Sequence, residues 1–327
     1  MSGMNPDTGV GANTGKTEKA ENAENAENRS TTGQSTTGTL TIDGMTVFTE
    51  TWEPEIPQPQ ATPLLMIHGL AGSTTTWTLV GGGLANALGA RVVAIDLAGF
   101  GKTVALERDA TLETNKALIF GALDQLGPSV LVGTSMGGAL AVQVGVARPS
   151  DVSALILVNP ALPRPSGNRE AISRTVKFAL SLAPKFAEPV LERRAQLLGA
   201  QRWVDSALEV VMADPESLPH DVRSRLVELA EARASDEGSF PAYVQAAGSL
   251  FKYLAGPMVD DIDFVRQPTL LIHGTQDRMV PVSWARSIMS RRTDWTYREY
   301  EDCGHIPSLE LPERLVGDIA EFLRDLH

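Results

Sequence analysis

The sequence has little of three things that would place it in a special class: cysteine, basic side chains and long apolar runs. Its 327 residues include one cysteine, Cys303, so no disulfide can form within the chain, and a reducing compartment fits. No apolar run reaches the length that is needed to cross a bilayer. The first residues also lack the basic start and the apolar core of a secretory signal. We therefore expect a cytoplasmic protein with no membrane span.

Positive charge is in deficit along the chain. The 28 lysine and arginine residues stand against 40 aspartate and glutamate residues, which gives a net charge of −12 and a pI near 4.9. Such a chain is repelled by phosphate backbones and by anionic lipid, so neither nucleic acid nor a membrane surface is an expected partner. The histidines and the single cysteine form no cluster with metal-ligand spacing. We expect a small-molecule substrate and water, with no metal and no organic cofactor.

Large apolar side chains are almost absent from residues 1–38. This segment contains the low-complexity stretches "ENAENAEN" and "STTGQSTTG". A segment of this composition cannot bury enough apolar surface to offset the entropy that it would lose on ordering. We predict a disordered tail over residues 1–38, with ordered sequence starting near Leu40.

Short apolar runs separated by helical segments follow the tail. The stretch "TLTIDGMTVFTETW" alternates apolar and polar residues around Asp43-Gly44, which predicts a β-hairpin. Later runs are continuously apolar, which predicts parallel strands covered on both faces. These runs are Pro63 to Gly69, Arg91 to Leu97, Ser129 to Ser135, Ala154 to Pro160 and Thr269 to Asp277. Helical segments are expected over Leu112 to Leu126, Gly137 to Ala147, Ser283 to Arg291 and Leu311 to Leu326. The alternation predicts an α/β fold with a mostly parallel, doubly wound sheet of about eight strands flanked by helices.

One interval breaks this alternation. No convincing strand occurs from about Leu162 to Asp263, where amphipathic helical segments with proline breaks begin at Arg169 and at Ser217. We predict a helical cap, or lid, over residues 162–263, inserted into a core made of residues 39–161 and 264–327. Its apolar side chains fit helix packing first, and some are candidates for an acyl pocket; they are Phe178, Leu182, Phe186, Leu197, Trp203, Met212, Phe240, Tyr243 and Phe251.

The sharpest local signal is "VLVGTSMGG", a buried strand that runs into a helix of small residues. It contains G-x-S-x-G at Gly133, Ser135 and Gly137, in the strand–turn–helix context that this motif requires. A tight turn there pushes the serine hydroxyl out of the sheet, and only small neighbours avoid the adjacent strand and helix. The turn also leaves backbone N–H groups at the helix N-terminus, where they can stabilise an oxyanion. The ordinary alternative is that Ser135 is a helix N-cap.

A serine hydroxyl is a weak nucleophile and needs a base that an acid holds in place. His305 lies in "EDCGHIPSLELPE", between a strand-like run and the last helix, and Asp277 lies in "HGTQDRMVP" at the end of an earlier strand. Sites in open parallel sheets form at the carboxyl ends of the strands, where Ser135, Asp277 and His305 all fall. Other acids weighed for the position of Asp277 are Asp124, Asp261 and Asp263.

Together these stretches resemble the α/β-hydrolase fold superfamily, over roughly Leu40 to His327. The match to the capped esterase and C–C-bond hydrolase branch is carried by "HGLAGS", "DLAGFGKT", "GTSMGG", "HGTQDRMVP" and "GHIPSLELP". The order serine, aspartate, histidine is also the order of this superfamily. In some relatives the acid follows the preceding strand, but Asn159 occupies that place here and cannot carry the charge.

The resemblance implies a role for each candidate residue. Ser135 would be the nucleophile, His305 the base and Asp277 the acid that orients it. The backbone N–H groups of Leu70 and Met136 would form the oxyanion hole.

The stretch "DLAGFGKT", Asp96 to Thr103, resembles the end of a phosphate-binding loop, but a carboxylate stands where that loop requires glycine. In the hydrolase family a similar stretch is a structural loop near the site entrance, and Lys102 would then be solvated. His68 and His273 are expected to hold loop backbone, and His220 is expected to be exposed in the cap. Cys303 is expected to be a half-buried loop thiol rather than a second nucleophile.

The resemblance implies a serine hydrolase that cleaves a carboxylic ester of a small or medium apolar substrate through an acyl-enzyme. Cleavage of a C–C bond in vinylogous diketones is the alternative on the same site, although Ile306 follows His305 where those enzymes often carry an aromatic residue. Lactonase or perhydrolase activity is a third variant. Haloalkane dehalogenases and epoxide hydrolases use aspartate where this chain has Ser135. A ligand-binding protein without turnover is the alternative of another class.

Overall fold

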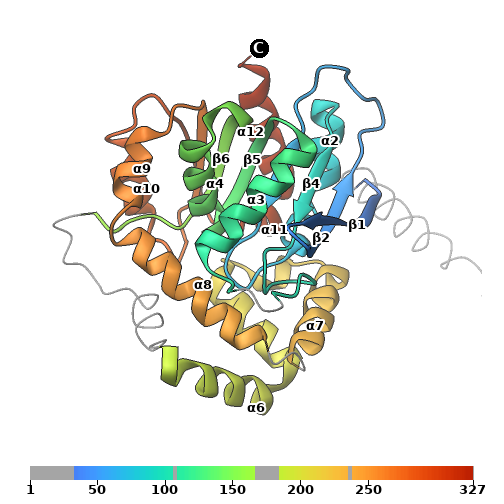
Figure 1. The fold of residues 1–327 in the computed structure, drawn as a ribbon, viewed down its shortest axis with the longest axis vertical. Coiled ribbons are helices and arrows are strands. Elements are labelled where there is room, and N and C mark those ends of the chain that lie inside the picture. The colour runs from blue at the N-terminus through green and yellow to red at the C-terminus, as the bar shows by residue number, and fades with distance from the viewer. Residues whose placement is uncertain (1–32, 106–108, 166–183, 235–237, 327) are drawn as a thin grey trace, which may run out of the picture.

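The computed structural model describes residues 33–105, 109–165, 184–234 and 238–326, and an eight-stranded sheet with helices on both faces forms its centre (Figure 1). The strand order is β1-β2-β4-β3-β5-β6-β7-β8, and the strands from β3 to β8 are parallel. Their bounds are β1 Ser35–Ile42, β2 Met45–Trp52, β3 Leu64–Ile67, β4 Val92–Ile95, β5 Ser129–Ser135, β6 Val152–Pro160, β7 Thr269–Gly274 and β8 Thr296–Tyr300. The predicted fold class is confirmed.

The antiparallel hairpin of β1 and β2 forms one edge of the sheet. Asp43 and Gly44 form its turn with φ of 47° and 78°, the left-handed region that suits a two-residue hairpin. The strand begins at Ser35, so residues 35–38 belong to the sheet and the predicted limit of the tail at residue 38 is wrong. Ser35 pairs with Trp52, and its Oγ donates to Glu50 Oε1 at 2.8 Å. Backbone pairing needs no apolar side chains, which is why composition missed these residues. Residues 1–32 of the predicted tail lie outside the described residues.

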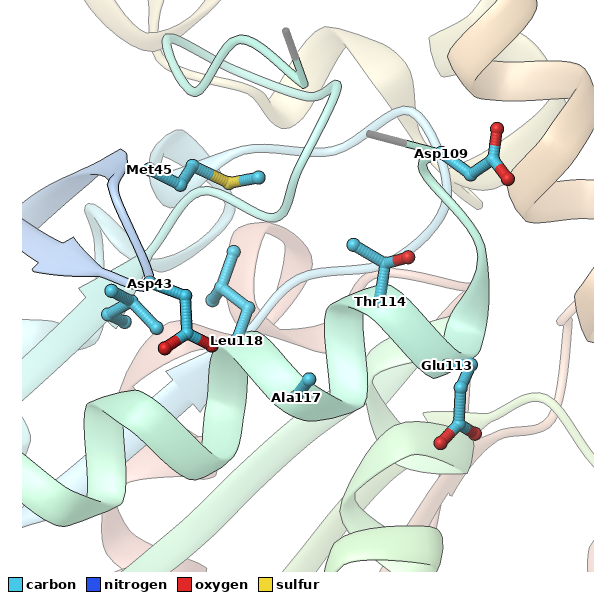
Figure 2. Close-up of a pocket in the computed structure, with 8 residues that line it drawn as sticks. Asp43, Met45, Asp109, Glu113, Thr114, Ala117 and Leu118 are labelled. Carbon is cyan, nitrogen blue, oxygen red and sulfur yellow. The ribbon is translucent and has the colours of Figure 1, made fainter. Parts of the chain in front are cut away.

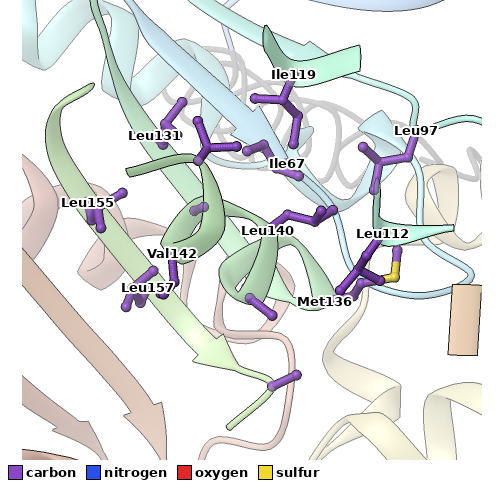
Figure 3. Close-up of a cluster of buried hydrophobic side chains, with 14 of the residues drawn as sticks. Ile67, Leu97, Leu112, Ile119, Leu131, Met136, Leu140, Val142, Leu155 and Leu157 are labelled. Atoms are coloured by element: carbon purple, nitrogen blue, oxygen red, sulfur yellow. The ribbon is translucent and has the colours of Figure 1, made fainter. Parts of the chain in front are cut away.

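Successive residues of the central strands alternate between two apolar cores, one on each face of the sheet. On one face Ile67, Leu131 and Leu157 pack against helices α3 (Leu112–Leu126) and α4 (Met136–Ala147), as Figure 3 shows. On the other face Met66 and Val132 pack against α2 (Gly81–Leu88) and α12 (Pro312–Arg324). Because both faces are covered, β3 and β4 are apolar at every position and the middles of β5, β6 and β7 are continuously apolar, as the runs predicted.

Short elements complete the core. They are α10 (Val282–Met289), α11 (Pro307–Glu310) and the 3₁₀ helices η1 (Thr74–Trp77) and η2 (Pro149–Asp151). Thr111 caps α3 by accepting from the N–H of Thr114 at 3.3 Å, which stabilises the start of that helix.

A helical insert separates β6 from β7, and its regular elements in the described residues are all helices. They are α6 (Pro184–Val211), η3 (Pro215–Ser217), α7 (His220–Ala234), α8 (Ser239–Leu254) and α9 (Met258–Phe264). The first part of the helical segment predicted from Arg169, up to residue 183, lies outside the described residues. The α6 helix follows it and is interrupted at Gly199, where φ is 71°. Among the helices described, none is long and apolar enough to cross a bilayer.

The helices of the insert lie together on one side of the sheet (Figure 1). They contact the core through both apolar and charged side chains. Arg225 of α7 pairs with the buried Glu50 of β2 at 3.2 Å and donates to Thr78 Oγ1 at 3.0 Å. Arg233, also of α7, donates to the carbonyl of Gly99 at 2.6 Å. These contacts bring the insert over the edge where the predicted site residues lie.

Candidate active site

Ser135 occupies a sharp turn between β5 and α4. Its φ of 52° and ψ of −118° are unusual for a residue with a side chain, and such strain is found where a site needs a fixed geometry. The flanking glycines leave room for this turn. A Cβ added at Gly133 would lie 2.3 Å from the carbonyl oxygen of Gly137, and one added at Gly137 would lie 2.1 Å from that of Ile67. The local geometry is therefore the strained turn that G-x-S-x-G predicted.

The structure brings Asp277 and His305 together at the same edge of the sheet. Asp277 lies in the turn after β7 and His305 in the loop between β8 and α11, and both side chains are buried. His305 Nδ1 lies 2.7 Å from Asp277 Oδ2. When Nδ1–H donates to this carboxylate, Nε2 is left as the acceptor that a general base requires.

The carboxylate of Asp277 is surrounded by donors. The N–H groups of Met279 and Val280 donate to Oδ1 at 2.7 and 2.9 Å, and Asn159 Nδ2 donates to Oδ2 at 2.7 Å. Burial alone would raise the pKa of Asp277, but the charge and hydrogen bond of His305, with the other donors, outweigh it and lower the pKa below its usual value. Asp277 is therefore ionised at neutral pH and can stabilise an imidazolium at His305.

The other acids that the sequence offered are bonded elsewhere. Asp124 pairs with Arg148 at 2.6 Å, Asp261 accepts from Tyr253 at 2.8 Å, and Asp263 pairs with Arg291. The geometry therefore favours Asp277 as the partner of His305.

The end of β6 connects Ser135 to the Asp277–His305 pair, through Asn159 and the next residue, Pro160. Ser135 pairs with Pro160 across β5 and β6, and Asn159 Nδ2 donates at 2.9 Å to the carbonyl of Gly304, the residue before His305. Within the described residues no hydrogen bond joins Ser135 Oγ to His305. Such bonds are often long in the absence of substrate and shorten when it binds.

The two predicted oxyanion donors belong to Met136, directly after Ser135, and to Leu70, in a loop beside it. Met136 is the first residue of α4. The N–H groups of the first turn of a helix have no acceptor within that helix, so the N–H of Met136 is available to an oxyanion. Leu70 follows Gly69, whose added Cβ would lie 2.9 Å from Ser135 Cβ. The loop that carries Leu70 therefore passes directly beside the serine.

His68 fixes that loop, as predicted. The Nδ1 atom of this buried side chain lies 2.7 Å from the carbonyl oxygen of Gly69, and the N–H of Leu97 donates to Nε2 at 3.0 Å. Burial lowers the pKa of His68 from 6.5 to about 4, the Gly69 bond opposes this, and the charge of Arg233 adds to it. His68 is therefore neutral, with Nδ1–H as donor and Nε2 as acceptor.

We expect His68 to make the stability of the protein depend on pH. Its pKa is lower in the folded state, so its contribution is fully present above pH 6.5 and is lost as the pH falls toward about 4. Relative to His68→Gln, the wild-type free energy of unfolding should fall by roughly 2–3 kcal/mol between pH 7.5 and pH 4.5, measured by urea denaturation. Asp96 has the opposite effect, but it is present in both proteins and cancels. A difference that does not change with pH would contradict this role.

The loop "DLAGFGKT" is closed by its own aspartate. Asp96 accepts from the N–H groups of Thr74 and Lys102, each at 2.7 Å. Burial raises the pKa of Asp96 to about 6, although these two hydrogen bonds oppose the shift. Lys102 is exposed, with its ammonium 4.6 Å from the centre of the Phe48 ring. The carboxylate fills the place that a phosphate would need, so the loop is structural.

The remaining candidates have the following surroundings. His273 Nε2 lies 2.8 Å from the carbonyl oxygen of Val280, which fits the predicted structural role, and His220 is exposed as predicted.

Cys303 is fully buried, so the expectation of a half-buried thiol is wrong. Burial raises the pKa of the Cys303 thiol far above its usual value, with a further contribution from the charge of Glu310. A neutral buried thiol is a poor nucleophile.

Leu70 of the core packs against apolar side chains of the insert. It lies against the buried pair Val244 and Ala247, against which Trp203, Phe240, Tyr243 and Phe251 also pack. A separate hollow of about 390 Å³ lies between the β1–β2 hairpin and α3, and Figure 2 shows Asp43, Asp109 and Glu113 around it. None of the predicted site residues lines this hollow.

Two residues that bond the candidate site were not predicted from the sequence as part of it. Asn159 was considered only as a failed acid, yet its amide bonds both Asp277 and Gly304, and its Oδ1 accepts from the N–H of Gly274 at 3.1 Å. Glu310 lies in "GHIPSLELP" and bonds the loop of His305. The signals available in the sequence were the position of Asn159 at the end of a predicted strand and that of Glu310 shortly after His305.

Comparison with known proteins identifies the class. A sequence profile described as "Alpha/beta hydrolase family" matches residues 64–318, and the chain belongs to this family. Lipase LipV of Mycobacterium tuberculosis (strain ATCC 25618 / H37Rv) is 31% identical to it, over 87% of this chain and 91% of the lipase. The 2-hydroxymuconate semialdehyde hydrolase of Pseudomonas sp. (strain CF600) is 27% identical, over 80% of this chain and 87% of that enzyme.

Solved structures agree on the fold. A membrane phospholipase A superposes with a TM-score of 0.70 at 22% identity, covering 94% of this chain and 91% of its own. The 2-hydroxy-6-oxo-6-phenylhexa-2,4-dienoate hydrolase from Rhodococcus sp. strain RHA1 also gives 0.70, at 18% identity, covering 89% of this chain and 99% of its own. The fold is thus common to enzymes that are named for different bonds.

Proposed function

We propose that this protein is a serine hydrolase that cleaves a carboxylic ester of a small or medium apolar substrate. The observation that carries the proposal is the buried His305–Asp277 pair, at 2.7 Å, on the sheet edge where Ser135 occupies a strained turn. The similarity to a lipase at 31% identity supports an ester as the bond cleaved.

The reaction proceeds through an acyl-enzyme. Ser135 Oγ attacks the ester carbonyl while His305 Nε2 takes its proton, and Asp277 stays ionised and stabilises the imidazolium. The N–H groups of Leu70 and Met136 stabilise the oxyanion, each worth roughly 3–4 kcal/mol. His305 then returns the proton to the leaving alcohol, and a water molecule attacks the acyl-enzyme while His305 takes its proton. The bond from the acyl carbon to Ser135 Oγ breaks, the carboxylic acid leaves, and His305 returns the proton to Ser135 Oγ.

The helical insert acts in this proposal as a cap, with residues 162–263 as its extent. Support for an apolar substrate comes from the four aromatic side chains of the insert that pack against Val244 and Ala247, the same pair that Leu70 contacts. An acyl chain next to the oxyanion donor would contact them and lose water, which favours an apolar group over a charged one.

Cleavage of a C–C bond is the second candidate, supported by the similarity to 2-hydroxymuconate semialdehyde hydrolase. The test compares kcat/KM for p-nitrophenyl acetate, butyrate and octanoate with that for a ring-fission vinylogous diketone. We expect at least one ester to exceed the diketone by roughly 100-fold or more. A diketone that is turned over faster than every ester would contradict ester hydrolysis and favour the C–C reaction.

A further inference from the structure

The carboxylate of Glu310, at the end of α11, accepts hydrogen bonds from three backbone N–H groups of two separate segments. Gly304 donates to it at 2.9 Å and Ile306 at 3.2 Å, so the two neighbours of His305 in the chain are both bonded to it. Ala213, just past the end of α6, donates at 2.7 Å. Glu310 thus joins the loop of the proposed base to the insert.

Backbone contacts reinforce this junction. The N–H of His305 donates to the carbonyl of Val211, the last residue of α6, at 2.6 Å. A Cβ added at Gly304 would lie 2.7 Å from both Val211 O and Ala213 N. The backbones of the two segments are therefore in contact, with no side chain between them. Arg278, next to Asp277, donates to the carbonyl of Glu209 at 2.5 Å. The loops of both the base and its acid therefore bond the end of one helix of the insert.

The last carbonyls of a helix lack partners within the helix and must find them outside it. At the end of α6, the partners include the N–H of His305 and the side chain of Arg278. In return, Glu310 satisfies the N–H of Ala213 together with those of Gly304 and Ile306. If the carboxylate is lost, three N–H groups lose their acceptor and the loop of His305 is freed to move away from α6.

We propose that Glu310 is a positioning residue that holds the His305 loop against the end of α6, so that the alignment of the base depends on the docked insert. The proposal rests on the function proposed for His305. Glu310 touches neither the substrate nor the reacting atoms; it acts through the two peptide groups that flank the base.

The test compares Glu310→Gln with Glu313→Gln, an exposed glutamate at the start of the next helix. One readout is steady-state ester hydrolysis, and the other is alkylation of Cys303 by iodoacetamide, which is independent of turnover. Cys303 is the single cysteine, is fully buried and lies in the same loop. For Glu310→Gln we expect kcat to fall about 10- to 100-fold with KM nearly unchanged, and alkylation to accelerate about 10-fold or more. Because the charge of Glu310 also raises the pKa of Cys303, the faster alkylation must appear in the charge-retaining variant Glu310→Asp as well. Glu313→Gln should match the wild type in both.

Either effect without the other overturns the proposal: faster alkylation with normal kcat, or reduced kcat with a Cys303 as protected as in the wild type. Glu310→Asp keeps the charge with a shorter reach, so it should fall between the wild type and the amide variant, and it replaces the amide variant if that does not fold. Failure of the proposed function is distinguishable, because the wild type would then show no ester turnover, or turnover would survive Ser135→Ala, whatever the alkylation rates.

Discussion

Ser135→Ala is expected to reduce kcat for p-nitrophenyl butyrate by at least about 10⁴-fold, because it removes the atom that forms the acyl-enzyme in the proposed mechanism. KM should change little, since alanine leaves the neighbouring side chains in place. The free energy of unfolding should also stay close to the wild-type value, because Ser135 Oγ has no hydrogen-bond partner among the described residues. Initial rates from purified protein, with stability from urea denaturation, provide the measurement.

Ser129→Ala is the matched control for this variant. Ser129 lies at the other end of the same strand, where its Oγ donates to the carbonyl of Gly127 at 2.9 Å. Its replacement should leave kcat unchanged and cost about 1 kcal/mol of stability. If Ser135→Ala retains turnover within tenfold of the wild type, Ser135 is not the nucleophile.

Asp277→Asn is expected to have the second-largest effect, a fall in kcat of about 10⁴-fold. The carboxylate accepts from His305 Nδ1 and from the N–H groups of Met279 and Val280. An amide has the same shape but only one accepting oxygen, so its NH₂ group must face a donor at one side. The imidazole then loses its orientation and the ion that stabilises its protonated form, while KM is expected to stay nearly constant.

Asp302→Asn is the control, because it makes the same chemical change in an exposed side chain near His305. Asp302 Oδ1 accepts from Gln276 Nε2 at 2.8 Å, and its φ of 54° is one that asparagine tolerates. This variant should keep wild-type kcat. If Asp277→Asn were as active as Asp302→Asn, another group would be the acid, and the buried pair with His305 would be structural.

Much of the core followed from the sequence because its signals are local. The run that became β3 is apolar at every position, and those that became β5 and β6 are continuously apolar over residues 130–133 and 154–158, which is what a strand covered on both faces requires. The turn at Ser135 was also predictable, because a side chain at position 133 would clash with Gly137 and one at position 137 would clash with Ile67 of the neighbouring strand β3.

Other features depend on contacts that no local pattern encodes. Residues 35–38 are polar and belong to a strand only because β2 offers them backbone partners. Cys303 lies in a buried cluster with residues far away in the sequence, such as Met66 and Val132, so the expected half-burial of its thiol was wrong. The bond from Glu310 to Ala213 joins residues 97 positions apart. Spacing within a motif can place an acid near a histidine loop, but it cannot show which helix the same acid reaches.

The central claim is that Ser135, His305 and Asp277 act as one unit on an ester. The most direct test is reaction with a fluorophosphonate, followed by digestion and mass spectrometry of the peptides. We expect a single adduct on the peptide that carries Ser135, no adduct in Ser135→Ala, and much slower labelling in Asp277→Asn. A protein that stays unlabelled while it binds a small ligand tightly, or one that is labelled at another residue, would contradict the account.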